Sequence, residues 1–109
     1  MSKTSNYRQI ICQFLSDFAE GDPEAQLIFD EKRDRYLVMH VAWRNEYRIY
    51  GCAMQLDLID SQVWIQNNST EIYVDRELIK RGIAAEDIVL GFRSPSVRAK
   101  IASIMANNQ

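Results

Sequence analysis

Short gaps between β-like runs leave this chain few ways to fold. Runs rich in β-branched and aromatic residues cover residues 25–30, 35–44, 47–59 and 63–66. Only Asn45-Glu46 separates the second run from the third, and Asp60-Ser61 can close the next turn. Gaps of about two residues close antiparallel hairpins and are too short for a crossover helix. The sequence therefore predicts a four-stranded antiparallel meander.

The Asn45-Glu46 turn also predicts which residues face each other. The expected pairs are Trp43 with Arg48, Val41 with Tyr50, Met39 with Cys52 and Leu37 with Met54. This face continues to Leu56 and Leu58, so we expect it to be the core face. A turn at Asp60-Ser61 pairs Leu58 with Val63 and Leu56 with Ile65, and it places Trp64 near Asp57 on the other face.

The first hairpin and the helices complete the predicted fold. An even loop near residues 30–34 puts Ile28 on the core face, whereas an odd loop puts Leu27 and Phe29 there. Apolar residues at helical spacing predict a helix over 5–20, with Ser5 as its N-cap. Asp75 can cap a short helix that ends at Gly82. Residues 84–92 fit either a helical turn or a short strand, and Ser94-Pro95 begins a final helix. Its expected apolar side comprises Val97, Ile101, Ile104 and Met105.

These elements predict one α+β domain over residues 1–109. Its sheet is a four-stranded antiparallel meander, with the N-terminal helix on one face and short C-terminal helices. The predicted core comprises Phe14, Phe18, Met39, Val41, Cys52, Met54, Leu56 and Ile65.

The second face of the long hairpin is unusually apolar and small for a solvated surface. The third run is thirteen residues long and would span roughly 43 Å at about 3.3 Å per residue. We expect it to bend near Gly51 or to be covered by a second subunit. The predicted partner or homodimer interface comprises Val38, Ala42, Ile49, Ala53 and Trp64.

Composition excludes several classes of site. The chain has one histidine, His40, and two distant cysteines, Cys12 and Cys52, so no pair has the spacing of metal ligands. The four glycines are scattered, which argues against a phosphate-binding loop. We therefore expect no catalytic residues, no cofactor and no metal. With no secretory leader or membrane-length apolar run, we also expect a cytoplasmic protein with reduced cysteines.

Charge is distributed unevenly along the chain, although the net charge is only −2. Residues 17–31 carry six acids and no base, whereas the C-terminal end carries Arg93, Arg98 and Lys100 and no acid. These three bases are a candidate for weak or indirect DNA contact, but a solvated helix face or a protein interface explains them better. The amide-rich "NNST" after Gln66 is best interpreted as a structural turn, in which Ser69 or Thr70 satisfies backbone donors.

Four segments, in this order, resemble the XisI family of fdxN element excision controlling factors. They are "QLIFDEKRDRY" (26–36), "RIYGC" (48–52), "VWIQNNSTE" (63–71) and "RELIKRGIAAEDIVLGFRSP" (76–95). The resemblance covers about residues 5–98. It departs at Ser61, where the family commonly has glycine, and in the tail, which lacks the family's aromatic residues.

The resemblance implies an intracellular cyanobacterial protein that controls a DNA excision carried out by a separate recombinase. Such proteins usually accompany XisH, which is similar to restriction-endonuclease-like nucleases. The family has no defined catalytic residue. We therefore expect a non-enzymatic regulator that binds an XisH-like partner, with a direct DNA-binding accessory factor as the alternative.

Overall fold

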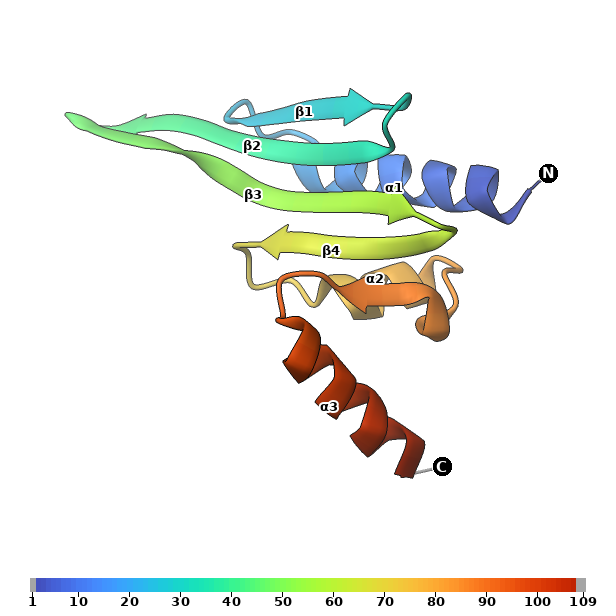
Figure 1. Cartoon of the computed structure of the whole chain (residues 1–109). Coiled ribbons are helices and arrows are strands. Elements are labelled where there is room, and N and C mark those ends of the chain that lie inside the picture. The colour runs from blue at the N-terminus through green and yellow to red at the C-terminus, as the bar shows by residue number, and fades with distance from the viewer. Residues whose placement is uncertain (1, 108–109) are drawn as a thin grey trace.

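The computed structural model describes residues 2–107, with side chains through residue 104. Its elements, shown in Figure 1, are α1 (Lys3–Ala19), β1 (Ala25–Asp30), β2 (Arg35–Arg44), β3 (Tyr47–Ile59), β4 (Gln62–Asn68), α2 (Val74–Lys80), a 3₁₀ turn (Ala85–Asp87), β5 (Ile88–Leu90) and α3 (Pro95–Asn107). None of the described helices has the length and apolarity needed to cross a membrane.

The sheet has five strands in the order β1-β2-β3-β4-β5. The first four strands form the predicted antiparallel meander, and the α+β class is confirmed. The four-stranded, purely antiparallel sheet is wrong, because β5 adds to β4 in parallel, with Val63 opposite Ile88. A parallel neighbour needs a crossover, which α2 supplies here. The three residues of β5 are too few to show strand periodicity in the sequence.

Both predicted two-residue turns are confirmed. Asn45 adopts a φ of 57°, and Asp60 and Ser61 adopt φ values of 50° and 63°. Two consecutive left-handed residues are the signature of a type I′ hairpin turn. Ser61 therefore occupies a position that favours glycine. The predicted pairs Leu58–Val63, Leu56–Ile65 and Asp57–Trp64 all form.

A β-bulge at Ala53 changes which side chains of β2 face the core. Met39 pairs with Cys52 as predicted, but Val38 pairs with Met54, so Ala53 is an extra residue on β3. The predicted Leu37–Met54 pair is wrong, because one inserted residue reverses the facing of everything beyond it.

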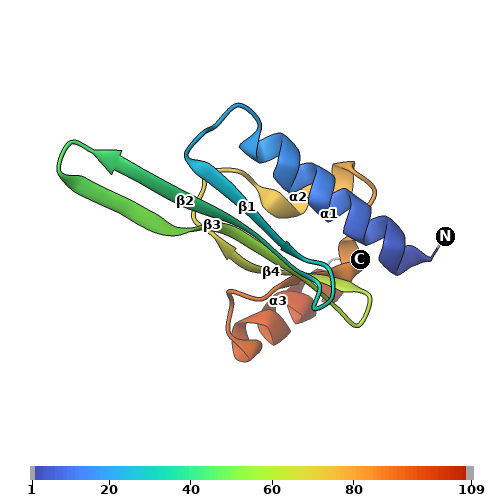
Figure 2. The same ribbon diagram turned by 90° about the horizontal axis from the view of Figure 1, so that it is seen from above.

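The core therefore uses the opposite face of β2 from the one predicted. Tyr36 and Val38 are 0% and 1% exposed, and they pack with Met54 and Leu56 against α1. Of the predicted core, Phe14, Met54, Leu56 and Ile65 are confirmed as buried, whereas Phe18, Met39, Val41 and Cys52 are only half-buried. Figure 2 shows α1 and α2 on one side of the sheet and α3 on the other.

The first hairpin loop is even, since Asp30 pairs with Arg35. The expected consequence, Ile28 in the core, is nevertheless wrong, because the core face of β2 is reversed. Phe29 packs on the core instead, with its ring 5.7 Å from that of Tyr36 in an edge-to-face arrangement. Ile28 lies on the opposite face and is 47% exposed.

The helix ends differ from the predictions by one to three residues. The N-cap of α1 is Ser2, whose hydroxyl accepts from the Ser5 amide at 3.1 Å, so Ser5 is not the cap. Tyr73, not Asp75, precedes α2 and forms no side-chain cap. The Ser94 cap of α3 is confirmed, because its Oγ accepts from the amide of Val97 at 3.3 Å. The Met105 side chain lies outside the described residues.

Candidate interaction surfaces

The β2–β3 hairpin extends beyond the rest of the sheet. β1 pairs with β2 no further than His40, and β4 pairs with β3 only from Met54 onward. Residues 42–52, which we call the arm, therefore form a two-stranded ribbon that projects from the molecule (Figure 1). A two-stranded ribbon alone is at best marginally stable in water. The arm thus depends on its own cross-strand contacts for its stability.

The side of the arm that faces the α1 layer carries small and apolar residues. A pocket of about 380 Å³ lies at its base, and its lining includes Phe18, Ile49, Gly51 and Ala53. We call this surface the trough. Tyr47, which is 73% exposed, lies at the tip of the arm on the same side.

Glu24 fixes the polar border of the trough. Its carboxylate accepts two bonds from the Arg44 guanidinium, at 2.7 and 2.9 Å, and lies 3.3 Å from Nε2 of His40. The Arg44 guanidinium, helped by His40, lowers the pKa of Glu24 to about 2. His40 lies opposite Gly51, as predicted, and serves this ion pair.

The other side of the same strands carries a continuous apolar row, which we call the open strip. It comprises Leu37, Met39, Val41 and Trp43 of β2 with Tyr50 of β3. Trp43 is 59% exposed and Tyr50 is 69% exposed. The guanidinium of Arg48 lies 4.9 Å from the centre of the Trp43 ring. Among the described residues, no helix seals this row as α1 seals the opposite face.

A buried carboxylate lies beside the open strip. Asp57 is 6% exposed and accepts from the side-chain amides of Gln55 at 3.1 Å and Gln66 at 3.2 Å. The sequence analysis placed Asp57 near Trp64 but missed these partners. Gln66, the amide residue after Ile65, was the signal that could have indicated this cluster. Its side chain reaches Asp57 only because a second bulge lies at Gln66 itself.

α3 touches the sheet beside this cluster through one stacked pair. The Arg98 guanidinium lies 5.2 Å from the centre of the Trp64 ring. The Trp64 indole Nε1 is buried and has no acceptor among the described residues. Trp64 is thus held between the sheet and α3 and is only half-exposed.

Two of the segments that carry the family resemblance lie side by side. β4 contains "WIQ" and β5 runs into "LGF", and the Phe92 amide donates to the Ile65 carbonyl at 3.2 Å. A Cβ on Gly91 would lie 2.5 Å from Oε1 of Gln66 and 3.2 Å from the Ile65 carbonyl oxygen. Gly91 therefore allows a close approach that keeps Gln66 on Asp57.

Two carboxylates tie α1 to the sheet. Asp87 accepts from the Tyr7 hydroxyl at 2.6 Å and pairs with Nζ of Lys3 at 2.6 Å. The Lys3 ammonium, with help from Tyr7, lowers the pKa of Asp87. Burial and the bond to Asp87 raise the pKa of Tyr7. This part of the family segment "DIVLGF" therefore has a structural role.

Asp34 forms the second tie, at the opposite edge of the sheet. It accepts two bonds from Arg8, at 2.8 and 3.1 Å, and one from the Tyr36 hydroxyl at 2.7 Å. The Arg8 guanidinium lowers the pKa of Asp34, and burial raises that of Tyr36. Asp34 adopts a φ of 54° at the end of the first hairpin loop.

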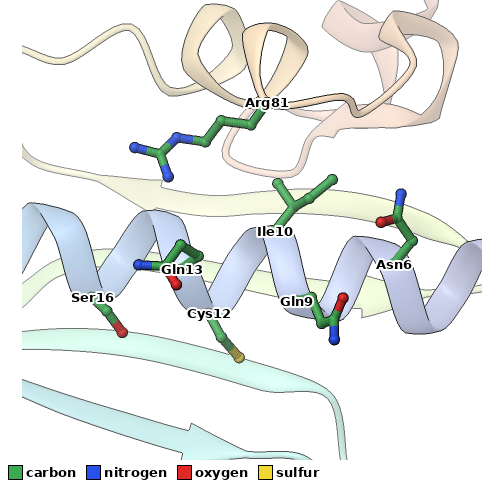
Figure 3. A pocket seen from close by; sticks show the side chains of 7 residues that line it. All are labelled: Asn6, Gln9, Ile10, Cys12, Gln13, Ser16 and Arg81. Carbon is green, nitrogen blue, oxygen red and sulfur yellow. The ribbon is translucent and has the colours of Figure 1, made fainter.

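A pocket of about 620 Å³ lies on the outer side of α1 (Figure 3). Its lining residues are Asn6, Gln9, Ile10, Cys12, Gln13, Ser16 and Arg81. Burial raises the pKa of the Cys12 thiol, which keeps it protonated and a weak nucleophile. Arg81 is already paired with Asp17 at 2.8 Å. Within the described residues, no three His, Cys, Asp or Glu side chains cluster as metal ligands would.

The five residues predicted as an interface do not form one surface. Val38 and Ala42 are 1% and 5% exposed, because they pack within the chain itself. Ile49 and Ala53 line the trough, whereas Trp64 lies on the opposite face.

The three predicted DNA-contact residues lie on or next to α3. The Arg93 guanidinium is 5.0 Å from the Phe92 ring, and Arg98 donates to the Arg93 carbonyl at 2.6 Å. Lys100 is exposed. Arg93 and Arg98 thus already contact other groups of the same chain.

The predicted "NNST" turn is confirmed. The amide of Ile72 donates to the Thr70 hydroxyl at 3.1 Å, and Asn68 accepts from the Thr70 amide at 3.0 Å.

The comparisons with known proteins agree with the resemblance noted in the sequence. A family model described as "XisI protein" matches residues 1–102. A XisI-like protein from Anabaena variabilis ATCC 29413 is 34% identical, covers 89% of this chain and 94% of its own, and superposes with a TM-score of 0.83. The fdxN element excision controlling factor XisI from the same strain is 31% identical, covers 89% and 99%, and gives a TM-score of 0.75.

No curated protein matches the chain. The family match nevertheless extends over nearly every described element, including both ties of α1 and the paired β4 and β5 segments. This chain is a member of the XisI family.

Proposed function

We propose that this protein is a cytoplasmic, non-enzymatic regulator that helps control programmed DNA excision by binding a XisH-like protein. Family membership and the likeness to a structure named as an excision controlling factor support the biological role. The observation that carries the mode of action is the projecting arm with its open, apolar trough. The arm offers a partner contact area that the chain itself leaves unused.

The chemistry of the titratable groups supports a binding role over a catalytic one. Asp34, Asp87 and Glu24 have lowered pKa values because each is paired with a base of the same chain. Catalytic acids and bases more often have pKa values shifted toward neutrality. These three carboxylates instead hold elements together.

Gly51 is the best single indicator that the trough receives a partner. A Cβ built at this position meets nothing within 4 Å, so no steric contact within the described residues requires glycine there. Glycine inside a strand weakens it and often marks a place where another backbone approaches closely. A partner segment lying over Gly51 would use that space and continue over Ile49 and Tyr47 toward the tip of the arm.

Co-purification with the XisH-like protein tests this proposal. Co-expression of a tagged XisH-like protein should retain the wild-type chain and lose the Gly51→Glu variant, whose carboxylate would be buried unpaired against the partner. Val41→Glu is the matched control and should be retained, because it adds the same charge to the opposite side of the arm. Equal retention of Gly51→Glu and wild type would contradict the trough as the site. Failure of the wild type to co-purify would contradict the proposed partner.

Direct DNA binding is the second candidate function. The observation in its favour is that residues 93–107 carry three bases and no acid. This candidate predicts affinity for duplex DNA that falls steeply with salt and weakens when Arg93, Arg98 and Lys100 are replaced by Ala. Salt-independent or absent duplex binding would rule it out.

A further inference from the structure

We propose that two copies of this chain pack face to face through their open strips, with α3 of each copy lying on β1 of the other. The strip is defined by Leu37, Met39, Val41, Trp43 and Tyr50. It lies on the side of the sheet opposite α1 and α2 (Figure 2). This inference does not rest on the proposed function, because the trough and the open strip are opposite sides of the same strands.

The exposed area of the strip is in the range of apolar patches that are often interaction sites. At 59% and 69% exposure, the Trp43 and Tyr50 rings together offer on the order of 300 Å². The half-buried members of the row and Ile28, at 47% exposure, extend this patch along β2 and β1. A standard interface needs about 800 Å² from each partner, so the strip can supply its centre and a second contact must supply the rest.

The strip also has the chemistry of an interface centre. At its exposed end the strip borders Arg48, which stacks on Trp43 and can stay there while the ring is covered, and at its other end it borders Arg35 and the buried Asp57. Interface centres are poor in charge and rich in Trp, Tyr, Met and Arg. Four apolar residues at alternate positions of β2 are the pattern of a buried strand face, and α1 covers only the other face.

α3 provides the second half of the contact. It lies on the same side of the sheet as the strip (Figure 2), yet Val97 and Ile104 are 41% and 55% exposed. Facing sheets lie about 10 Å apart, and a helix with its side chains is about 10–12 Å across. Because these two lengths match, α3 of one copy fits beside its own sheet and against the edge strands of the partner's sheet.

Charge selects which flank of the partner receives α3. A two-fold axis across the strands would bring the two α3 helices together, each with two bases, Arg98 and Lys100, and no acid. An axis along β2 instead places each α3 on the partner's β1. β1 carries Asp30 and no base, and on this face it exposes Ile28, two positions before Asp30. Opposite charges and exposed apolar side chains then meet at both symmetric contacts.

Light scattering on purified full-length protein tests the central contact. Wild type should have the mass of a dimer at about micromolar concentration, and Val41→Glu should raise the dimer dissociation constant at least roughly 100-fold. Gly51→Glu is the matched control, because it adds the same charge to the other side of the arm and should leave the dimer intact. A monomeric wild type at high micromolar concentration, or an unchanged Val41→Glu dimer, would overturn the proposal.

Folding is checked separately so that a collapsed arm is not mistaken for a lost contact. Circular dichroism of Val41→Glu should match wild type, and if it does not, Tyr50→Ala replaces it, since that side chain is mostly exposed. Truncating Tyr50 should raise the dissociation constant roughly tenfold or more. An unchanged dissociation constant in folded Tyr50→Ala would count against the strip.

Two further variants test the α3 contact. Val97→Asp and Ile28→Glu should each weaken the dimer about tenfold, because each puts a carboxylate into the same apolar contact from opposite sides. Their effects should be less than additive, since either change breaks the one contact that they share. If both variants dimerise like wild type, α3 does not lie on β1 of the partner.

Discussion

The two faces of β2 carry similar side chains and meet very different surroundings. Tyr36 and Val38 are sealed beneath α1, whereas Leu37, Met39 and Val41 alternate with them and remain partly open. Polarity alone does not distinguish the two rows. The difference shows that a chain of this size has helices enough to cover one face of a five-stranded sheet. Burial of the closed face stabilises the single chain. The open face is available for contacts with other molecules.

Truncation of one residue on each face should give the largest contrast. Leu56→Ala removes a side chain that is 0% exposed and should lower the free energy of unfolding by about 2–5 kcal/mol. Val41→Ala, on the open face, should cost less than about 1 kcal/mol in protein dilute enough to be monomeric. Urea unfolding followed by tryptophan fluorescence measures both. Equal losses would mean that the two faces are equally covered.

The carboxylates of the two faces offer a second contrast. Asp34 anchors α1 through Arg8, whereas Asp57 on the open face receives amide donors from Gln55 and Gln66. Asp34→Asn should cost about 1–3 kcal/mol at pH 7, because it removes a charged partner, and Asn tolerates the left-handed turn position. Asp57→Asn should cost about 1 kcal/mol, since its bonds are to neutral groups.

The Asp34 contribution should also depend on pH. Arg8 lowers the pKa of Asp34 in the folded protein, so its stabilisation is complete above the unfolded pKa of about 3.9. That stabilisation is lost as pH falls through the folded value. Urea midpoints measured from pH 7 to pH 2 should therefore converge for wild type and Asp34→Asn in acid. A constant difference across this range would contradict the ion pair.

The sequence was sufficient to predict the strand order of the meander. It was insufficient to predict which side chains of β2 point toward the core. Two-residue turns at Asn45 and Asp60 fixed strand order and most pairs, because turn length leaves little choice of register. The bulge at Ala53 could not be predicted, since Ala fits regular and bulged strands alike. It reverses which side chains of β2 face the core and which face the open side of the sheet. β5 was missed because its partner in β4 is remote in sequence and its pattern is only three residues long.

The candidate surfaces were predictable to a similar degree. The sequence indicated that the long hairpin carries more apolar surface than one chain covers. Two of the residues that it named for that surface, Val38 and Ala42, are buried within the chain, because the set was chosen from the predicted facing of β2. The Asp57 cluster required the Gln66 bulge, which is likewise invisible in a single sequence.

Two glycines provide a third, smaller contrast. Gly91→Ala places a methyl group against the Ile65 carbonyl oxygen and Gln66, which must leave Asp57, so it should cost about 1–2 kcal/mol. Gly51→Ala meets nothing within 4 Å and should be neutral or slightly stabilising, because the unfolded chain loses freedom. Thermal unfolding of both variants measures the difference. A destabilised Gly51→Ala would show that the arm itself requires glycine.

The smallest effect concerns the border of the trough. Arg44→Ala should raise the pKa of Glu24 from about 2 toward its ordinary value, because the guanidinium is the main cause of the shift. Overall stability should change little, since this pair is largely solvent-exposed. Carboxyl chemical shifts followed by NMR during acid titration give the value directly. An unchanged Glu24 pKa would mean that His40, not Arg44, holds the carboxylate.

The parallel attachment of β5 has a consequence for the order of folding. The first four strands close through neighbouring turns, whereas β5 must wait for the crossover through α2 before it can pair with Val63 and Ile65. Only three residues hold this last strand, and α3 follows it directly. Amide protons of β5 should therefore exchange with solvent through local opening, well before those of β2 and β3. β5 and α3 can then open together while α2, whose Val74 and Leu78 are buried in the core, stays packed.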